Sequence, residues 1–78
     1  NPETELLVDL YFDGHSINWK SEMRSDLKID IYDLQARKVF SQQISSSGSL
    51  ETSFLNSGIY LLKFSSDEKM FVWKIVKP

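Results

Sequence analysis

The 78-residue sequence contains no cysteine, two prolines, three glycines and a single histidine. Without cysteine the chain has neither a disulfide nor a thiolate metal site, so apolar packing must hold it together. His15 lies beside a predicted turn, where we expect an ordinary surface residue and no catalytic base. Three glycines supply no glycine-rich phosphate loop. The sequence therefore predicts a protein that is not an enzyme and that uses no metal or cofactor.

Long apolar runs and an excess of one charge are also missing. No stretch approaches the roughly 20 apolar residues needed to cross a bilayer as a helix, and no signal peptide opens the chain. Nine basic and eleven acidic side chains give a net charge of −2, with the two signs mixed along the sequence. Since nucleic-acid binding needs a basic patch, we expect no nucleic-acid partner. Residues 1–78 suit one domain, and a start at Asn1-Pro2 without Met suggests a piece of a longer protein.

Apolar residues recur at every second position through most of the chain, which predicts strands and not helices. We expect hairpins formed by residues 6–12 with 15–20, 27–32 with 37–44, and 59–65 with 70–76. Residues 50–55 are expected to form a brief strand or an extended crossing segment, and the polar stretches 21–26 and 45–49 to form loops. The segment 59–65 is apolar on both faces until Lys63, which is typical of a strand in the middle of a sheet.

About seven strands at this spacing predict an all-β fold, a small immunoglobulin-like antiparallel β-sandwich without a disulfide. A five- or six-stranded barrel is the alternative, because strand count does not separate the two architectures. In either case we expect Tyr60, Leu62, Phe64 and Ile75 in the core.

Two groups of side chains suggest binding chemistry. Four aspartates would form a calcium site if their strands paired suitably: Asp9, Asp13, Asp30 and Asp33. No stretch has the alternating-ligand loop of such sites, so solvated strand faces explain these residues better. Four aromatic residues would offer a sugar-stacking platform if they were exposed: Tyr11, Trp19, Tyr32 and Trp73. We favour buried or half-buried positions for them, and a carbohydrate-binding or adhesion module is the alternative function.

Three segments, in this order, carry a resemblance to a known family: LKIDIYDLQARKV at 27–39, GIYLLKF at 58–64 and WKIVK at 73–77. The ordered set resembles the C-terminal sorting domain of the type IX secretion system of Bacteroidetes. In that family a strand ending in Tyr-Asp precedes a turn and a basic residue, a Gly-Ile-Tyr strand follows, and a short lysine-rich strand ends the protein. Ala36 stands where the family usually has glycine. An alanine forced to positive φ there would cost on the order of 1 kcal/mol, unless the turn is of another type.

The resemblance implies a secretion signal. The type IX translocon would recognise the domain and carry the protein from the periplasm across the outer membrane to the cell surface. A sortase would then cleave many members and join the cargo to anionic lipopolysaccharide, while other members keep the domain as surface components of the machinery. A structural spacer between domains is a third interpretation.

We expect recognition at the closing hairpin, where a free strand edge would accept a partner strand or form an edge-strand dimer. The candidate recognition residues are Gly58, Ile59, Tyr60, Lys74, Ile75, Val76 and Lys77. Among them Lys74, Val76 and Lys77 are favoured for direct contact, because charged and terminal positions contribute least to packing.

Overall fold

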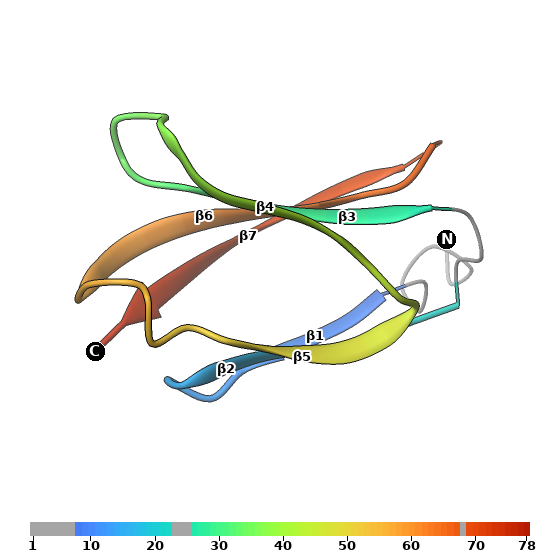
Figure 1. The fold of residues 1–78 in the computed structure, drawn as a ribbon, viewed down its shortest axis with the longest axis horizontal. Helices are drawn as coiled ribbons and strands as arrows, with labels where there is room; N and C mark the ends of the chain where they lie inside the picture. The colour runs from blue at the N-terminus through green and yellow to red at the C-terminus, as the bar shows by residue number, and fades with distance from the viewer. Residues whose placement is uncertain (1–7, 23–25, 68) are drawn as a thin grey trace.

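The structure is a computed structural model that describes residues 8–22, 26–67 and 69–78. The strands are β1 (Val8–Phe12), β2 (Ser16–Ser21), β3 (Leu27–Tyr32), β4 (Lys38–Ile44), β5 (Ser47–Glu51), β6 (Gly58–Ser65) and β7 (Met70–Lys77). They form two facing layers, a three-stranded sheet β1-β2-β5 and a four-stranded sheet β4-β3-β6-β7 (Figure 1). Every strand pair is antiparallel. The predicted seven-stranded antiparallel sandwich is confirmed, and the barrel alternative is wrong.

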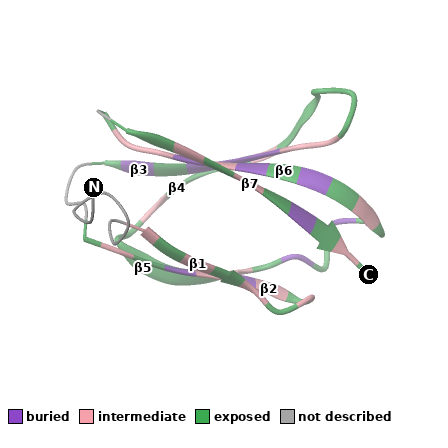
Figure 2. Cartoon of the chain, turned by 180° about the vertical axis from the view of Figure 1, so that it is seen from behind, coloured by how far each residue is buried: buried purple, intermediate pink, exposed green. Residues whose placement is uncertain are grey.

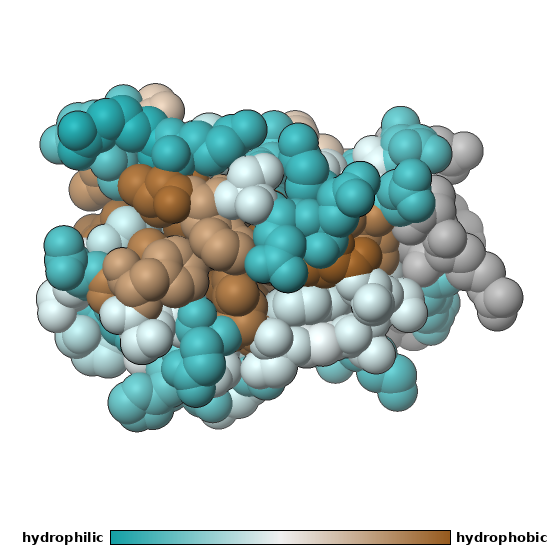
Figure 3. All heavy atoms as spheres, viewed as in Figure 1, coloured by the Kyte–Doolittle hydropathy of each residue, from teal (hydrophilic) through white to brown (hydrophobic). Residues whose placement is uncertain are grey.

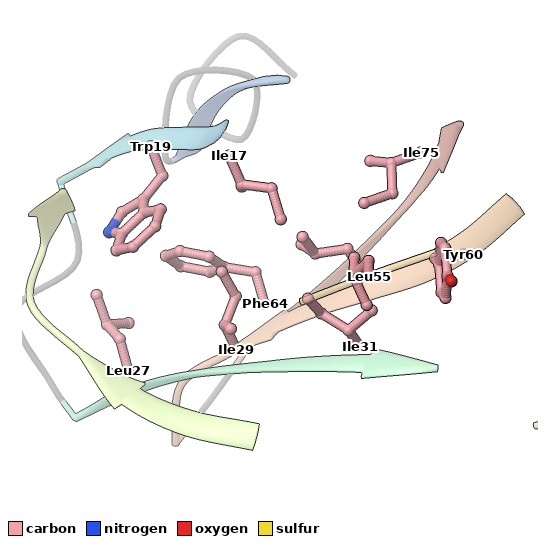
Figure 4. Packing of buried hydrophobic residues seen from close by; sticks show 10 residues of the cluster. Ile17, Trp19, Leu27, Ile29, Ile31, Leu55, Tyr60, Phe64 and Ile75 are labelled. Carbon is pink, nitrogen blue, oxygen red and sulfur yellow. The ribbon is translucent and has the colours of Figure 1, made fainter. Parts of the chain in front are cut away.

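The core lies between the two sheets and follows directly from the two-residue period of the strands. Five of the core side chains have no exposed surface: Ile17 of β2, Ile29 and Ile31 of β3, and Leu62 and Phe64 of β6. Figure 4 shows the side chains of Ile17, Ile29, Ile31 and Phe64 pointing from both sheets into the same space, and Leu62 belongs to the same core cluster. Figure 2 shows buried and exposed residues alternating along the strands, and Figure 3 shows apolar atoms gathered between the layers with hydrophilic residues outside them.

The residues expected in the core are confirmed there, since Tyr60, Leu62, Phe64 and Ile75 are all buried. β6 also lies in the middle of its sheet, between β3 and β7, as its apolar character predicted. Its second face is not covered, however: Leu61 remains 40% exposed. The apolar residues on that face therefore have a role other than filling the core.

The predicted loop at 45–49 is wrong for its last three residues. Ser47, Gly48 and Ser49 belong to β5 and pair with β2. Serine and glycine favour loops, but here the edge of β2 offers backbone hydrogen bonds and Gly48 lies against the indole of Trp19. A Cβ at Gly48 would stand 2.9 Å from Trp19 Cζ2, so this position needs glycine for close packing. Of the segment expected at 50–55, only residues 50–51 are strand.

Parts of two other predictions fall outside the described residues. The first strand was expected to begin at residue 6, and β1 is described from Val8. The loop expected at 21–26 includes residues 23–25, while Ser21 closes β2. Within the described residues no helix is long and apolar enough to span a membrane.

The last two residues close one end of the sandwich, where the C-terminus lies beside the β5–β6 connection (Figure 1). Buried Thr52 donates its hydroxyl to the carbonyl oxygen of His15 at 2.7 Å, and Lys77 Nζ donates to Thr52 Oγ1 at 2.9 Å. Ser57 Oγ donates to the carbonyl oxygen of Pro78 at 2.9 Å. The end of β7 is therefore fixed to both sheets.

Candidate functional site

The closing hairpin consists of β6 and β7, paired from Gly58 opposite Lys77 to Ser65 opposite Met70. β7 is an edge strand of the four-stranded sheet, with β6 on one side and no strand of the described chain on the other. Because residues directly opposite one another in an antiparallel pair share a face, the register divides the candidate residues into two groups.

The outer group faces away from the core. Ile59 pairs with Val76, and Leu61 pairs with Lys74. Ile59 is 39% exposed and Val76 57%, and Lys74 is also exposed. We give the name outer hairpin face to five of the side chains on this surface: Ile59, Leu61, Val72, Lys74 and Val76. It is an apolar strip on an edge of the sheet that contains the positive charge of Lys74, and Lys63 lies next to it, opposite Val72.

The inner group is committed to the fold. Tyr60 and Ile75 are opposite each other and buried, and the Tyr60 hydroxyl donates to the carbonyl oxygen of Asn56 at 2.8 Å. Gly58 has a φ of 152°, a conformation that residues with side chains rarely adopt. Lys77 uses its ammonium to bind Thr52. Exposed Lys74 is thus free for direct contact, as expected of a charged position near the end of the chain, whereas Lys77 helps to hold the fold together.

The Tyr-Asp segment builds the turn between β3 and β4. Asp33 Oδ1 accepts the backbone N–H groups of Gln35 and Arg37 at 2.9 and 3.0 Å, and Arg37 Nε donates to Asp33 Oδ2 at 2.9 Å. These bonds, above all that from the Arg37 backbone, hold the pKa of Asp33 below its ordinary value of 3.8. Ala36 lies in this turn with a φ of 65°, so the conformational cost expected from the sequence is present. The alternative of a turn without positive φ is wrong.

The four aspartates do not converge on a metal site. Asp13 and Asp33 each cap their own turn, and the backbone N–H groups of Ser16 and His15 lower the pKa of Asp13. Among the residues that the structure describes, no three His, Cys, Asp or Glu side chains are placed to hold a metal ion. Solvent contact explains Asp9, but Asp30 is 1% exposed and needs another explanation.

The aromatic platform required by the carbohydrate interpretation is absent from the described strands. Trp19 faces the core at 8% exposure and donates its Nε1–H to the carbonyl oxygen of Ser45 at 3.0 Å. Tyr11 is 63% exposed but lies opposite Asn18, on the other face of the same sheet. Trp73 is half-buried on the inner face of β7 and stacks on Phe71. The proposed pair of Trp19 with Tyr11 is therefore wrong.

Comparison with known proteins accounts for this combination of a closed core and a free terminal hairpin. Residues 12–78 match the family described as the secretion system C-terminal sorting domain. The chain belongs to that family. It is a sorting domain of the type IX secretion system, in a family that is not enzymatic, and the predictions of family, function and lack of enzyme activity are confirmed.

Among solved structures, the sorting domain is similar to a DUF3244 family protein of immunoglobulin-like β-sandwich fold from Bacteroides vulgatus. The two share 14% sequence identity with a TM-score of 0.83, over 97% of this chain and 88% of the other. At that identity the likeness shows the fold alone, and it confirms the immunoglobulin-like sandwich. No curated protein matches the chain.

Proposed function

We propose that the type IX translocon recognises this sorting domain at the outer hairpin face and along the free edge of β7. Membership of the family implies secretion across the outer membrane to the surface. The outer hairpin face and the β7 edge are where we place the contact with the translocon. The observation that carries it is the division of the closing hairpin into a buried inner face and an outer face on which Ile59, Lys74 and Val76 are exposed.

The four edge strands of the sandwich differ in how well they are protected against pairing. β1 and β5 have five residues each, and β4 is polar and begins at a β-bulge opposite Tyr32. β7 has eight residues and exposes Met70, Val72 and Val76 on its outer side, with Lys74 as the single charge among them. Short, polar or bulged edges resist strand addition, whereas a long apolar edge invites it. β7 is therefore the edge best suited to receive a partner strand.

A translocon strand suits this edge better than a second copy of the domain. An antiparallel pair of two β7 strands centred on Lys74 would place the two ammonium groups directly opposite one another, and like charges in that position destabilise a sheet. A partner strand with an acidic residue opposite Lys74 and apolar neighbours would instead complement it. We therefore expect no edge-strand dimer in solution, and a measurement of the oligomeric state tests this expectation.

The later steps belong to the same proposal. Residues 1–78 act as a single domain of a longer exported protein, which a sortase then processes at the surface, with anionic lipopolysaccharide as the attachment partner. Lys77, Gly58, Tyr60 and Ile75 serve recognition indirectly, because they hold the hairpin in place.

Export of the full-length protein in its native cell tests the proposal. Deleting 70–78 should leave the protein in the periplasm, and normal surface arrival of that truncation would refute the role of the hairpin. Because the deletion also removes buried Ile75, the sharper variant is the double substitution Lys74→Glu and Val76→Glu, which changes only exposed side chains. We expect periplasmic accumulation, measured by fractionation and by protease accessibility on intact cells.

The control is Lys20→Glu, which makes the same lysine-to-glutamate exchange on an exposed position of β2 in the other sheet. This variant should reach the surface normally. Equal export of the double variant and the control would contradict recognition at the outer hairpin face.

A further inference from the structure

Strand pairing collects positive charges on one face of the fold, although the two signs of charge are mixed along the sequence. Alternation along the strands brings four lysines to the outer face of the four-stranded sheet: Lys28 of β3, Lys38 of β4, Lys63 of β6 and Lys74 of β7. Along the strands of that face the one acidic residue is Asp30, opposite Lys63. A chain with a net charge of −2 thus carries one distinctly basic surface.

Asp30 is the anchor of this surface. It is 1% exposed, and neither of its carboxylate oxygens has a hydrogen-bond partner. The ammonium groups of Lys28 and Lys38 lie 3.8 Å from Oδ2 and Oδ1, one on each oxygen. A carboxylate buried in this way is stabilised by the charges around it and in turn draws them together.

The ring of Tyr32 also holds two of these lysines close together. Lys38 Nζ and Lys63 Nζ lie 6.0 and 5.8 Å from the centre of its ring. Such a position attracts a cation to the ring. Lys28, Lys38 and Lys63 therefore come from three neighbouring strands to one place, held by Asp30 and Tyr32. We call these three lysines the lysine cluster.

The lysine cluster has a net positive charge and N–H donors that are free to bind a ligand. Three ammonium groups against one carboxylate leave two positive charges uncompensated, and about half of the Lys28 and Lys38 side-chain surface, 46% and 45%, faces solvent. Each ammonium carries three donors, and Asp30 occupies them only at long range. Because Asp30 itself is buried, an approaching anion would meet the ammonium groups and not the carboxylate.

We propose that the lysine cluster binds phosphate groups. A lysine ammonium acts as a compact point charge that suits a tetrahedral, multiply charged oxyanion, whereas planar carboxylates are better matched by arginine. Two uncompensated positive charges match the charge of a phosphate monoester near neutral pH. The phosphate belongs to a soluble molecule or to a lipid headgroup, and the two sources are separable by experiment. The site adjoins the translocon contact proposed above, since Lys63 lies opposite Val72, but it takes a different ligand.

Binding is tested on the 78-residue chain by two-dimensional ¹H–¹⁵N NMR, with sodium pyrophosphate as the probe and sodium chloride at equal ionic strength as the reference. We expect saturable shifts at the amides of 28–32, 38 and 63 with pyrophosphate only. Lys63→Gln should weaken binding about fivefold, the effect of one unit charge at ~4 Å in water. The control Lys20→Gln removes the same charge from the other sheet and should bind like the unsubstituted chain.

Shifts no larger than those with chloride, or equal affinity of Lys63→Gln and Lys20→Gln, would overturn the assignment. The spectra also report whether each variant is folded. The source is tested by cosedimentation with phosphatidylcholine vesicles that contain or lack phosphatidic acid, whose headgroup is a phosphate monoester. Cluster-dependent binding only to the vesicles with phosphatidic acid supports a lipid phosphate, and pyrophosphate binding without vesicle binding supports a soluble phosphate. Neither result depends on whether the domain is exported.

Discussion

Replacing Ala36 with glycine should stabilise the domain, because this residue adopts a left-handed backbone conformation with φ 65°. That conformation costs an L-residue with a Cβ roughly 1–2 kcal/mol. Glycine removes this cost but gains freedom in the unfolded chain, which returns about 0.4–1 kcal/mol. The net gain is about 0.5–1 kcal/mol. Ala36 is exposed, so no packing is lost with its methyl group.

The surrounding turn is fixed independently of this residue's side chain. The Ala36 backbone N–H donates to the carbonyl oxygen of Asp33 at 3.0 Å, and Asp33 N–H donates to that of Arg37 at 3.0 Å. Glycine keeps both bonds, so the native turn should persist. For a domain of this size 1 kcal/mol shifts Tm by about 4–8 °C, and we expect Ala36→Gly to raise Tm by about 2–8 °C.

Calorimetry or circular dichroism melting, together with urea unfolding, measures this effect. The matched control is Gln35→Gly in the same turn, where the native φ is not positive and glycine should lower Tm. A fall in Tm for Ala36→Gly, or an equal rise for both variants, would refute the argument from backbone strain.

Three further substitutions test the packing and the electrostatics of the fold. Gly48→Ala should destabilise by about 1–3 kcal/mol and change the Trp19 fluorescence, because the new methyl would overlap the indole. Thr52→Val should lower the free energy of unfolding in urea by about 1–3 kcal/mol, because the His15 carbonyl oxygen and the Lys77 ammonium both lose their hydrogen bond to the threonine hydroxyl. Asp33 has a lowered pKa when folded, so its contribution is present above pH 3.8 and is lost as pH falls through the folded value. Asp33→Asn should therefore reduce the loss of Tm as the pH falls below 3.8, measured by melting curves.

The strands of the four-stranded sheet were predictable because their apolar residues alternate and nearby turns set their pairing. β5 was missed because Ser47, Gly48 and Ser49 have loop-like composition, and only the tertiary contact of Gly48 with Trp19 makes a strand favourable. Local composition carries no information on such a contact, since the two residues are 29 positions apart in the sequence. Tertiary context overrode the local preference.

The lysine cluster could not be predicted from the sequence either, because it also depends on tertiary contacts. Its members stand at positions 28, 38 and 63, and a search for a run of basic residues passes over them. Their meeting depends on β4 and β6 lying on opposite sides of β3 and on a register that places Lys63 opposite Asp30. A shift of one residue in either pair would turn these side chains to the core. Alternation predicts which residues share a face, and register then decides which of them meet.

The same alternation separates recognition from stability in the closing hairpin. Under the proposal that the translocon binds the folded hairpin, a substitution at buried Tyr60 or Ile75 would impair export whether or not the translocon contacts either residue. Exposed Ile59, Lys74 and Val76 contribute little to the core, so an export defect there reports on the partner. A folded outer-face variant, with unchanged Tm and lost surface delivery, is the result that only recognition explains. Loss of delivery in proportion to loss of Tm would instead make stability the whole signal.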